Sequence, residues 1–118
     1  MRPDPRALLS DIESAAADIS RYIAGMNSHA YSRDDQTQAA VERKFEIIGE
    51  ALNRLHQISP EIAERIPRWR KAVDFRNLLI HGYAVVESER VWLFAQNKLP
   101  ELGSIVRMLL SELGPPEE

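Results

Sequence analysis

The chain has 118 residues, which suffices for one compact domain with a hydrophobic core and is too short for two. Hydrophobic residues make up 44% of it, charged residues 28%, and no apolar run approaches the roughly 18 residues that a membrane-spanning helix needs. The net charge of −3 argues against unselective nucleic-acid binding over the whole surface, and the lack of cysteine excludes disulfides and thiolate chemistry. The N-terminus lacks the layout of a secretory signal. We therefore expect a soluble cytoplasmic protein with one domain over residues 1–113 and a disordered tail over residues 114–118.

A first amphipathic helix is predicted over residues 7–25. Its apolar positions are spaced alternately four and three residues apart, which is the period of one helix face. These positions are Leu8, Ile12, Ala15, Ile19, Tyr22 and Met26. The polar residues 27–35 are interpreted as a loop leading into the next helix, with Ser32 or Asp34 as its N-cap.

A second helix is predicted from about Asp35 to Ile58. Its core stripe consists of Val41, Phe45, Ile48, Leu52 and Leu55. The helix ends at Ser59 because the residue before a proline avoids the helical region, and a short helical turn follows over residues 60–65. Gly49 inside this helix costs about 1 kcal/mol relative to alanine, and we attribute it to the close packing of another helix.

Two more helical segments complete the predicted fold. One runs from Pro67 to about His81 and ends at Gly82. The other begins near residue 87 or 88 and continues to about residue 109, with Pro100 expected to kink it or split it in two. Because no sustained period-2 alternation occurs, the predicted fold class is all-α, an up-and-down bundle of four main helices plus a short one.

The segment over residues 67–81 is unusually apolar. On a helical wheel its apolar arc covers more than half the circumference, whereas a surface helix needs a stripe of only roughly 100°. The arc contains Trp69, Ala72, Val73, Phe75, Leu78, Leu79 and Ile80. Such a helix must be covered on two sides, and in a chain this small we expect the second cover to be another copy of the protein.

Arg76 projects from inside this apolar arc, where an unpaired guanidinium is costly. Two environments would satisfy it: a carboxylate of the second helix, with Glu46 or Glu50 as candidates, or a polar cleft at a subunit boundary. Asn77 and His81 are four residues apart and therefore neighbours on one face. The narrow polar face of the helix holds Arg70, Asp74, Asn77 and His81.

An arginine, an amide and a histidine at one helix end suit phosphodiester cleavage. Histidine can move protons near neutral pH, and arginine can hold a phosphate and stabilise the charge that develops on it. The structural alternative is an arginine paired to a carboxylate of the second helix and a histidine that caps the helix C-terminus. On residue types alone, the structural alternative is the more frequent one.

The string Arg76-Asn77-Leu78-Leu79-Ile80-His81-Gly82-Tyr83 resembles the Arg-x4-His-x-Tyr signature of HepT-like toxins in the HEPN superfamily. Other segments are similar to that family in the same order, and the resemblance spans about residues 8–110. These segments are residues 42–52, residues 66–70 with Phe75, and Val91-Trp92 with Leu99-Pro100. The resemblance implies a helical-bundle homodimer in which the two motifs meet near the two-fold axis, in a shared RNA cleft.

The resemblance also implies RNA cleavage without a metal or cofactor, by attack of the ribose 2′-OH on the adjacent phosphate. By this likeness Arg76 would bind the scissile phosphate, His81 would transfer protons and Asn77 would orient the histidine or the phosphate. Supporting or RNA-contacting roles are expected for Arg70, Glu46 and Glu50.

Family members are partnered by an MNT-type nucleotidyltransferase antitoxin, which silences the toxin by adding AMP to the motif tyrosine, here Tyr83. The added bulk and negative charge would block RNA entry. A function of a different class is the alternative: a non-catalytic helical module that uses the same dimer and cleft to bind the nucleotidyltransferase or a nucleotide.

Overall fold

The computed structural model describes residues 4–81 and 88–114, with position 81 described by its backbone alone. Within these ranges the chain forms seven helices and no strand, which confirms the predicted all-α class. The helices are α1 (Pro5–Tyr22), α2 (Ser28–Ser32), α3 (Asp35–Ile58), α4 (Pro60–Ala63), α5 (Trp69–His81), α6 (Ser88–Asn97) and α7 (Leu99–Leu113).

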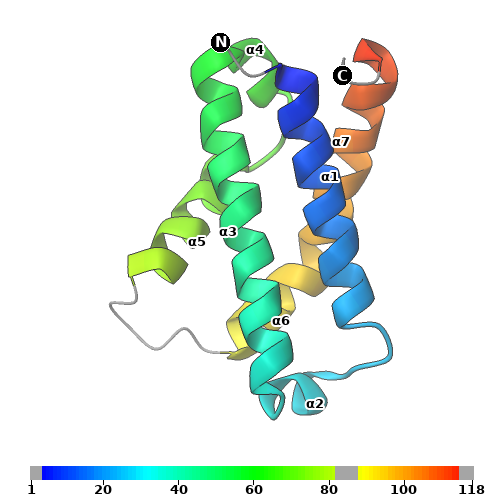
Figure 1. The fold of residues 1–118 in the computed structure, drawn as a ribbon, viewed down its shortest axis with the longest axis vertical. Coiled ribbons are helices and arrows are strands. Elements are labelled where there is room, and N and C mark those ends of the chain that lie inside the picture. The colour runs from blue at the N-terminus through cyan, green and yellow to red at the C-terminus, as the bar shows by residue number, and fades with distance from the viewer. Residues whose placement is uncertain (1–3, 82–87, 115–118) are drawn as a thin grey trace.

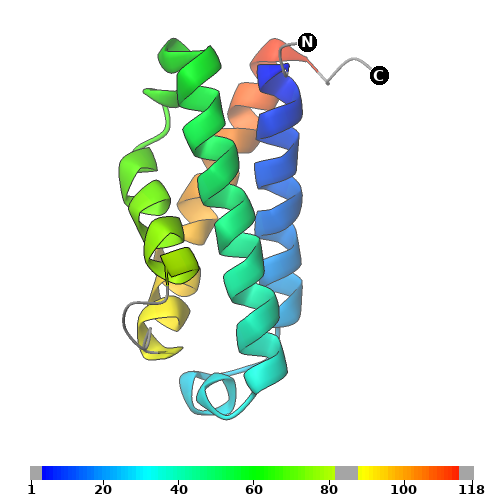
Figure 2. The same cartoon turned by 60° about the vertical axis from the view of Figure 1, so that its left-hand side comes forward.

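The long helices run up and down beside one another (Figure 1). Helix α3 lies between α1 and α5, and α1 also packs along α7. The short helices α2 and α4 lie at opposite ends of α3 (Figure 1). A turned view shows α5 against one flank of α3 while α1 covers another (Figure 2). Helix α5 is therefore an outer helix of the bundle.

The core follows the predicted stripes closely. All five predicted core residues of α3 are buried, as are Leu8, Ile12, Ala15 and Ile19 of α1. Tyr22 and Met26, at the end of the first stripe, are only partly buried. Three aromatic rings join α3, α5 and α6: Phe45 meets Phe75 and Phe94 edge-on at centroid distances of 5.4 and 5.3 Å. This burial of apolar surface is the main source of stability.

The loop interpretation of residues 27–35 is wrong over α2, a short helix at Ser28–Ser32. Asn27 caps it, because its side-chain oxygen accepts a hydrogen bond of 2.8 Å from the backbone N–H of Ala30. Tyr31 anchors the helix to the core, with only 1% of its surface exposed and its ring 5.4 Å from that of Trp92. A local cap and one buried aromatic residue thus suffice to order this turn.

The ends of the other helices refine the prediction. Of the two predicted caps, Ser32 and Asp34, the residue that caps α3 is Asp34, which accepts hydrogen bonds from the backbone N–H and hydroxyl of Thr37. Helix α5 begins at Trp69 and not at Pro67, because Arg68 adopts a left-handed backbone with φ of 61°. The predicted break at Pro100 divides the last segment into α6 and α7, and Pro100 lies in the first turn of α7, where no hydrogen bond is lost.

Candidate active site on α5

Gly49 sets how closely α5 approaches α3. A Cβ at this position would overlap the Cβ of Arg76 and would lie 2.8 Å from its Cγ and 3.0 Å from the carbonyl oxygen of Ala72. No side chain larger than hydrogen fits there without moving α5. The close packing predicted from Gly49 is confirmed, and the residue that it accommodates is Arg76.

Arg76 lies half-buried in the seam between α5 and α3. Its Nη1 donates a hydrogen bond of 2.9 Å to Oδ1 of Asn77. Its Nε is buried and has no hydrogen-bond partner among the described residues. The guanidinium is therefore oriented by an amide, and it keeps one donor for an acceptor that the described part of the chain does not supply.

The expected pairing of Arg76 with Glu46 or Glu50 is not found in the described part of the chain. Glu50 is exposed and lines a small hollow of about 140 Å³ beside Leu8 and Asp11 of α1. Glu46 is half-buried. Burial of Glu42 raises the pKa of that carboxyl, and the negative charge of Glu46 contributes to the same shift. Where side chains are described, no three His, Asp or Glu residues come together as a metal-binding group.

The N-terminal end of α5 contacts α3 where Trp69 meets His56 of α3. The ring of His56 stacks on Trp69 at 4.2 Å, and its Nε2 lies 3.3 Å from a carboxylate oxygen of Glu64. The guanidinium of Arg70 lies over the ring of Trp69, with its Cζ 5.1 Å from the ring centroid. Its Nη2 lies 3.7 Å from Oε1 of Glu64. Together with Asn53, Val73 and Asp74, these side chains line a hollow of about 400 Å³.

The sequence pattern does not single out His56. No local signal identifies its role, because His56 and Trp69 belong to different helices and meet only in the folded chain.

The C-terminal part of the motif is only partly described. Position 81 is the last residue of α5, as predicted, but the side chain of His81 lies outside the described residues. Gly82 and Tyr83 also lie outside them. The predicted roles of His81 and Tyr83 therefore stay predictions, while Arg76 and Asn77 are brought together directly by their hydrogen bond.

The wide apolar arc of α5 is not fully covered by the described part of the chain. Trp69, Ala72 and Phe75 are buried, whereas Ile80 is 44% exposed. Leu78 and Val73 are only partly buried. Neighbouring helices thus cover one side of the arc and leave its margin open to solvent.

Comparison with known proteins identifies the family. The family described as ribonuclease HepT-like matches residues 12–109. A protein of Methanocaldococcus jannaschii named "Putative RNase" is 33% identical over 99 residues, which are 84% of this chain and 81% of that protein. A protein of Thermococcus cleftensis named "Probable ribonuclease HepT" is 30% identical over 102 residues, 86% of this chain and 92% of that protein.

No solved structure matches the chain significantly. In the described residues, no helix is long and apolar enough to cross a membrane. The match runs from within α1 to within α7 and includes α5 and its motif. The chain therefore belongs to the ribonuclease HepT-like family, as the string at Arg76 predicted.

Proposed function

We propose that this chain is an endoribonuclease that cleaves RNA without a metal, with Arg76, Asn77 and His81 as its catalytic residues. The observation that carries the proposal is the environment of Arg76. Its guanidinium is half-buried, hydrogen-bonded to the amide of Asn77 and without a carboxylate partner in the described chain. Its buried Nε has no acceptor there. A bound phosphate would supply both the missing negative charge and the missing acceptor.

The chemistry that these residues support is transfer of a phosphoryl group within the RNA strand. The 2′-oxygen forms a bond to the neighbouring phosphorus, the bond to the 5′-oxygen of the next nucleotide breaks, and a 2′,3′-cyclic phosphate results. The proton lost by the 2′-OH is balanced by the proton gained by the leaving 5′-oxygen, and His81 is suited to carry it. Arg76 would stabilise the extra negative charge on the phosphorane-like transition state.

Two further proposals concern partners. A homodimer would cover the open margin of α5 at Ile80 and bring two copies of the motif together. A nucleotidyltransferase antitoxin of the MNT type would silence the enzyme by transferring AMP to Tyr83, placing bulk and negative charge beside the site. Membership of the family supports both proposals, and the position of Tyr83 in the sequence, two residues after the end of α5, supports the second.

Cleavage of RNA by the purified protein tests the enzyme proposal. Wild type should cleave single-stranded RNA in EDTA and leave 2′,3′-cyclic phosphate and 5′-OH ends. Arg76→Ala and His81→Ala should each lower kcat by at least about 100-fold, in line with the loss of a charge-stabilising donor or a proton carrier.

Far-UV circular dichroism of both variants shows whether the helical fold is kept. A wild-type protein as inert on RNA as the two variants would refute the enzyme and leave a binding module. Cleavage that stops in EDTA would refute only its independence of metal.

A further inference from the structure

A second hollow, of about 350 Å³, lies on the flank of α5 that faces α6. It is lined by Lys71, Asp74, Phe75, Leu78, Arg90 and Phe94. Its floor is apolar: Phe75 is buried, Phe94 is half-buried, and their rings stack at 4.8 Å with an interplanar angle of 7°. The volume falls within the range of about 300–1,000 Å³ that is typical of small-ligand sites.

Two cations stand at the rim of this hollow. Lys71 of α5 and Arg90 of α6 are both exposed, and neither forms an ion pair or hydrogen bond with another described residue. Among the described residues of the lining, Asp74 is the only acidic one, so these residues carry an excess of positive charge. In a protein of net charge −3, two unpaired cations beside an aromatic floor favour a ligand with a flat ring and a negative charge.

The hollow lies on a different flank of α5 from the candidate active site, since neither Arg76 nor Asn77 is among the described residues that line it. Leu78, in its lining, directly follows Asn77, and Asp74 lines both this hollow and the one beside His56 and Arg70. Lys71 precedes Arg76 by five residues, about 7.5 Å along the helix axis. Five residues also turn about 140° around the helix axis, so a strand held at Arg76 reaches the hollow only by passing around α5 over more than one nucleotide.

We propose that this hollow is a subsite for an unstacked nucleotide of a single-stranded RNA substrate, further along the strand from the scissile phosphate. Lys71 and Arg90 bind its phosphate, and the floor formed by Phe75, Leu78 and Phe94 receives the flat face of its base. A base can lie on such a floor only when it is unstacked, so the subsite selects single strands or loops over duplex RNA. The inference rests on the proposed ribonuclease function and specifies how its substrate is held.

Binding of a non-cleavable strand tests the subsite. The probe is a fluorescein-labelled 2′-O-methyl RNA of mixed sequence, which lacks the attacking hydroxyl, and its Kd is measured by anisotropy at several salt concentrations. The Lys71→Ala/Arg90→Ala double variant should raise Kd by at least about tenfold. It should also flatten the plot of log K against log salt by about 0.7, because each phosphate neutralised on a single strand contributes about 0.7 to that slope and the two cations share one phosphate.

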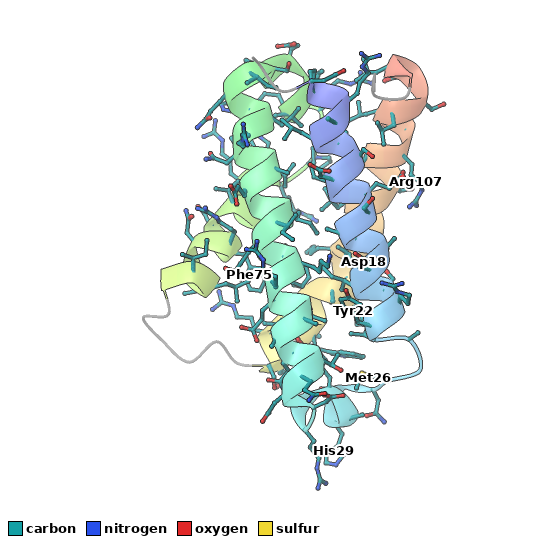
Figure 3. All side chains as sticks on the ribbon, in the orientation of Figure 1. Asp18, Tyr22, Met26, His29, Phe75 and Arg107 are labelled. Atoms are coloured by element: carbon teal, nitrogen blue, oxygen red, sulfur yellow. The ribbon has the colours of Figure 1, made fainter. Side chains whose placement is uncertain are left out.

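A matched control removes the same charge elsewhere. Arg33 and Arg107 are also exposed, and Arg107 on α7 is far from Phe75 on α5 in the view that shows the side chains (Figure 3). The Arg33→Ala/Arg107→Ala variant should change Kd by less than about threefold. An equal loss in both double variants would mean that only net charge matters, and would overturn the subsite.

Kinetics separate this inference from the function on which it rests. On cleavable RNA the Lys71→Ala/Arg90→Ala variant should raise KM and leave kcat within about twofold, whereas Arg76→Ala lowers kcat. If wild type cleaves RNA but the double variant keeps wild-type Kd and salt slope, the subsite is refuted and the ribonuclease stands. If wild type neither binds nor cleaves RNA, both fail.

Two further arms identify the ligand. Duplex 2′-O-methyl RNA should bind at least about tenfold more weakly than the single strand, and equal binding would overturn the role of the floor. Free 5′-AMP should bind more weakly than the strand, because it lacks the contact at Arg76. Tighter binding of 5′-AMP than of RNA would make the hollow a mononucleotide site and refute the proposal.

Discussion

At the scale of single residues, the position of Arg76 depends on an atom that is absent. The missing Cβ of Gly49 leaves the space that the Cβ and Cγ of Arg76 occupy. The glycine costs about 1 kcal/mol in helix propensity relative to alanine, and in return it allows α5 to approach α3 closely. The seam between α3 and α5 is thus fitted around the candidate catalytic arginine.

Gly49→Ala should lower the free energy of unfolding by about 1–3 kcal/mol, the usual cost of overpacking, despite the better helix propensity of alanine. It should also lower RNA cleavage, because Arg76 must shift. Gly103→Ala on α7 is the control: there the nearest atom is the flexible Nη1 of Arg107, at 3.3 Å, so stability should hold or rise. Urea denaturation measures the stability of both variants. A Gly49→Ala protein as stable as wild type would contradict the claim that Gly49 is needed for the close packing of α5 on α3.

Tyr31 carries a buried hydroxyl without a hydrogen-bond partner in the described chain. Burial raises the pKa of its phenol, with a smaller contribution from the charge of Glu42. An unsatisfied buried polar group costs about 1–3 kcal/mol, so Tyr31→Phe should raise the free energy of unfolding by about 1 kcal/mol. Tyr22→Phe, at a half-buried position, should change it by less than about 0.5 kcal/mol. If Tyr31→Phe is destabilising in urea melts, the hydroxyl has a partner.

At the scale of helices, one ion pair connects the two longest elements. Lys44 Nζ of α3 lies 2.9 Å from Asp18 of α1, and Arg21 lies 3.0 Å from the other oxygen of the same carboxylate. The hydrogen bond from Lys44 lowers the pKa of Asp18, and the same contact raises the pKa of Lys44. Asp18 is labelled on α1 in Figure 3.

The sign of the pKa shift predicts the pH dependence of this contact. Because the pKa of Asp18 is lower in the folded chain, its stabilisation is present above the unfolded-state pKa of about 3.9 and is lost as pH falls through the folded value. Asp18→Asn should therefore reduce stability at pH 7 and make no difference near pH 2. Urea melts across this range test the effect, with Asp11→Asn, an exposed carboxylate of the same helix, as control. A deficit that is independent of pH would assign the effect to packing.

At the scale of the whole molecule, charge and apolar exposure both bear on α5. The net charge of −3 means that RNA must be drawn to a local group of cations and not to the protein as a whole. Ile80, an exposed apolar residue, lies on α5 four residues after Arg76. A dimer formed there would bring the two active sites close together, which is the geometry of the proposed shared cleft.

Ile80→Gln should weaken the proposed dimer by at least about tenfold, because a two-fold interface loses the buried apolar side chain twice. Met108→Gln on α7, at a residue 45% exposed, should leave association unchanged. Sedimentation equilibrium over a range of micromolar concentrations measures both. A wild-type protein that is monomeric throughout this concentration range would refute the dimer proposal, and the description of the fold would still hold.

The elements of the fold were predictable because helical periodicity is a local property. The stripes at Ile12, Phe45 and Val106 face the core as their spacing requires, and Asp34 caps α3 through its own side chain. The short helix α2 was missed because its stability comes from the burial of Tyr31 against Trp92, a residue 61 positions away. The start of α5 was misplaced because the left-handed backbone of Arg68 has no signature in the side chain.

The candidate site divides in the same way. By itself the sequence determined that an arginine interrupts an apolar arc, that an amide lies beside it and that the family motif follows, since all three are properties of one continuous segment. Only the tertiary structure decided that Arg76 faces Gly49 and not a glutamate, and that Lys71 and Arg90 share a hollow. Those relations depend on how far apart two helices lie and which flanks they turn to each other. Helix spacing is set by the side chains of both partners at once, and no single helical pattern contains it.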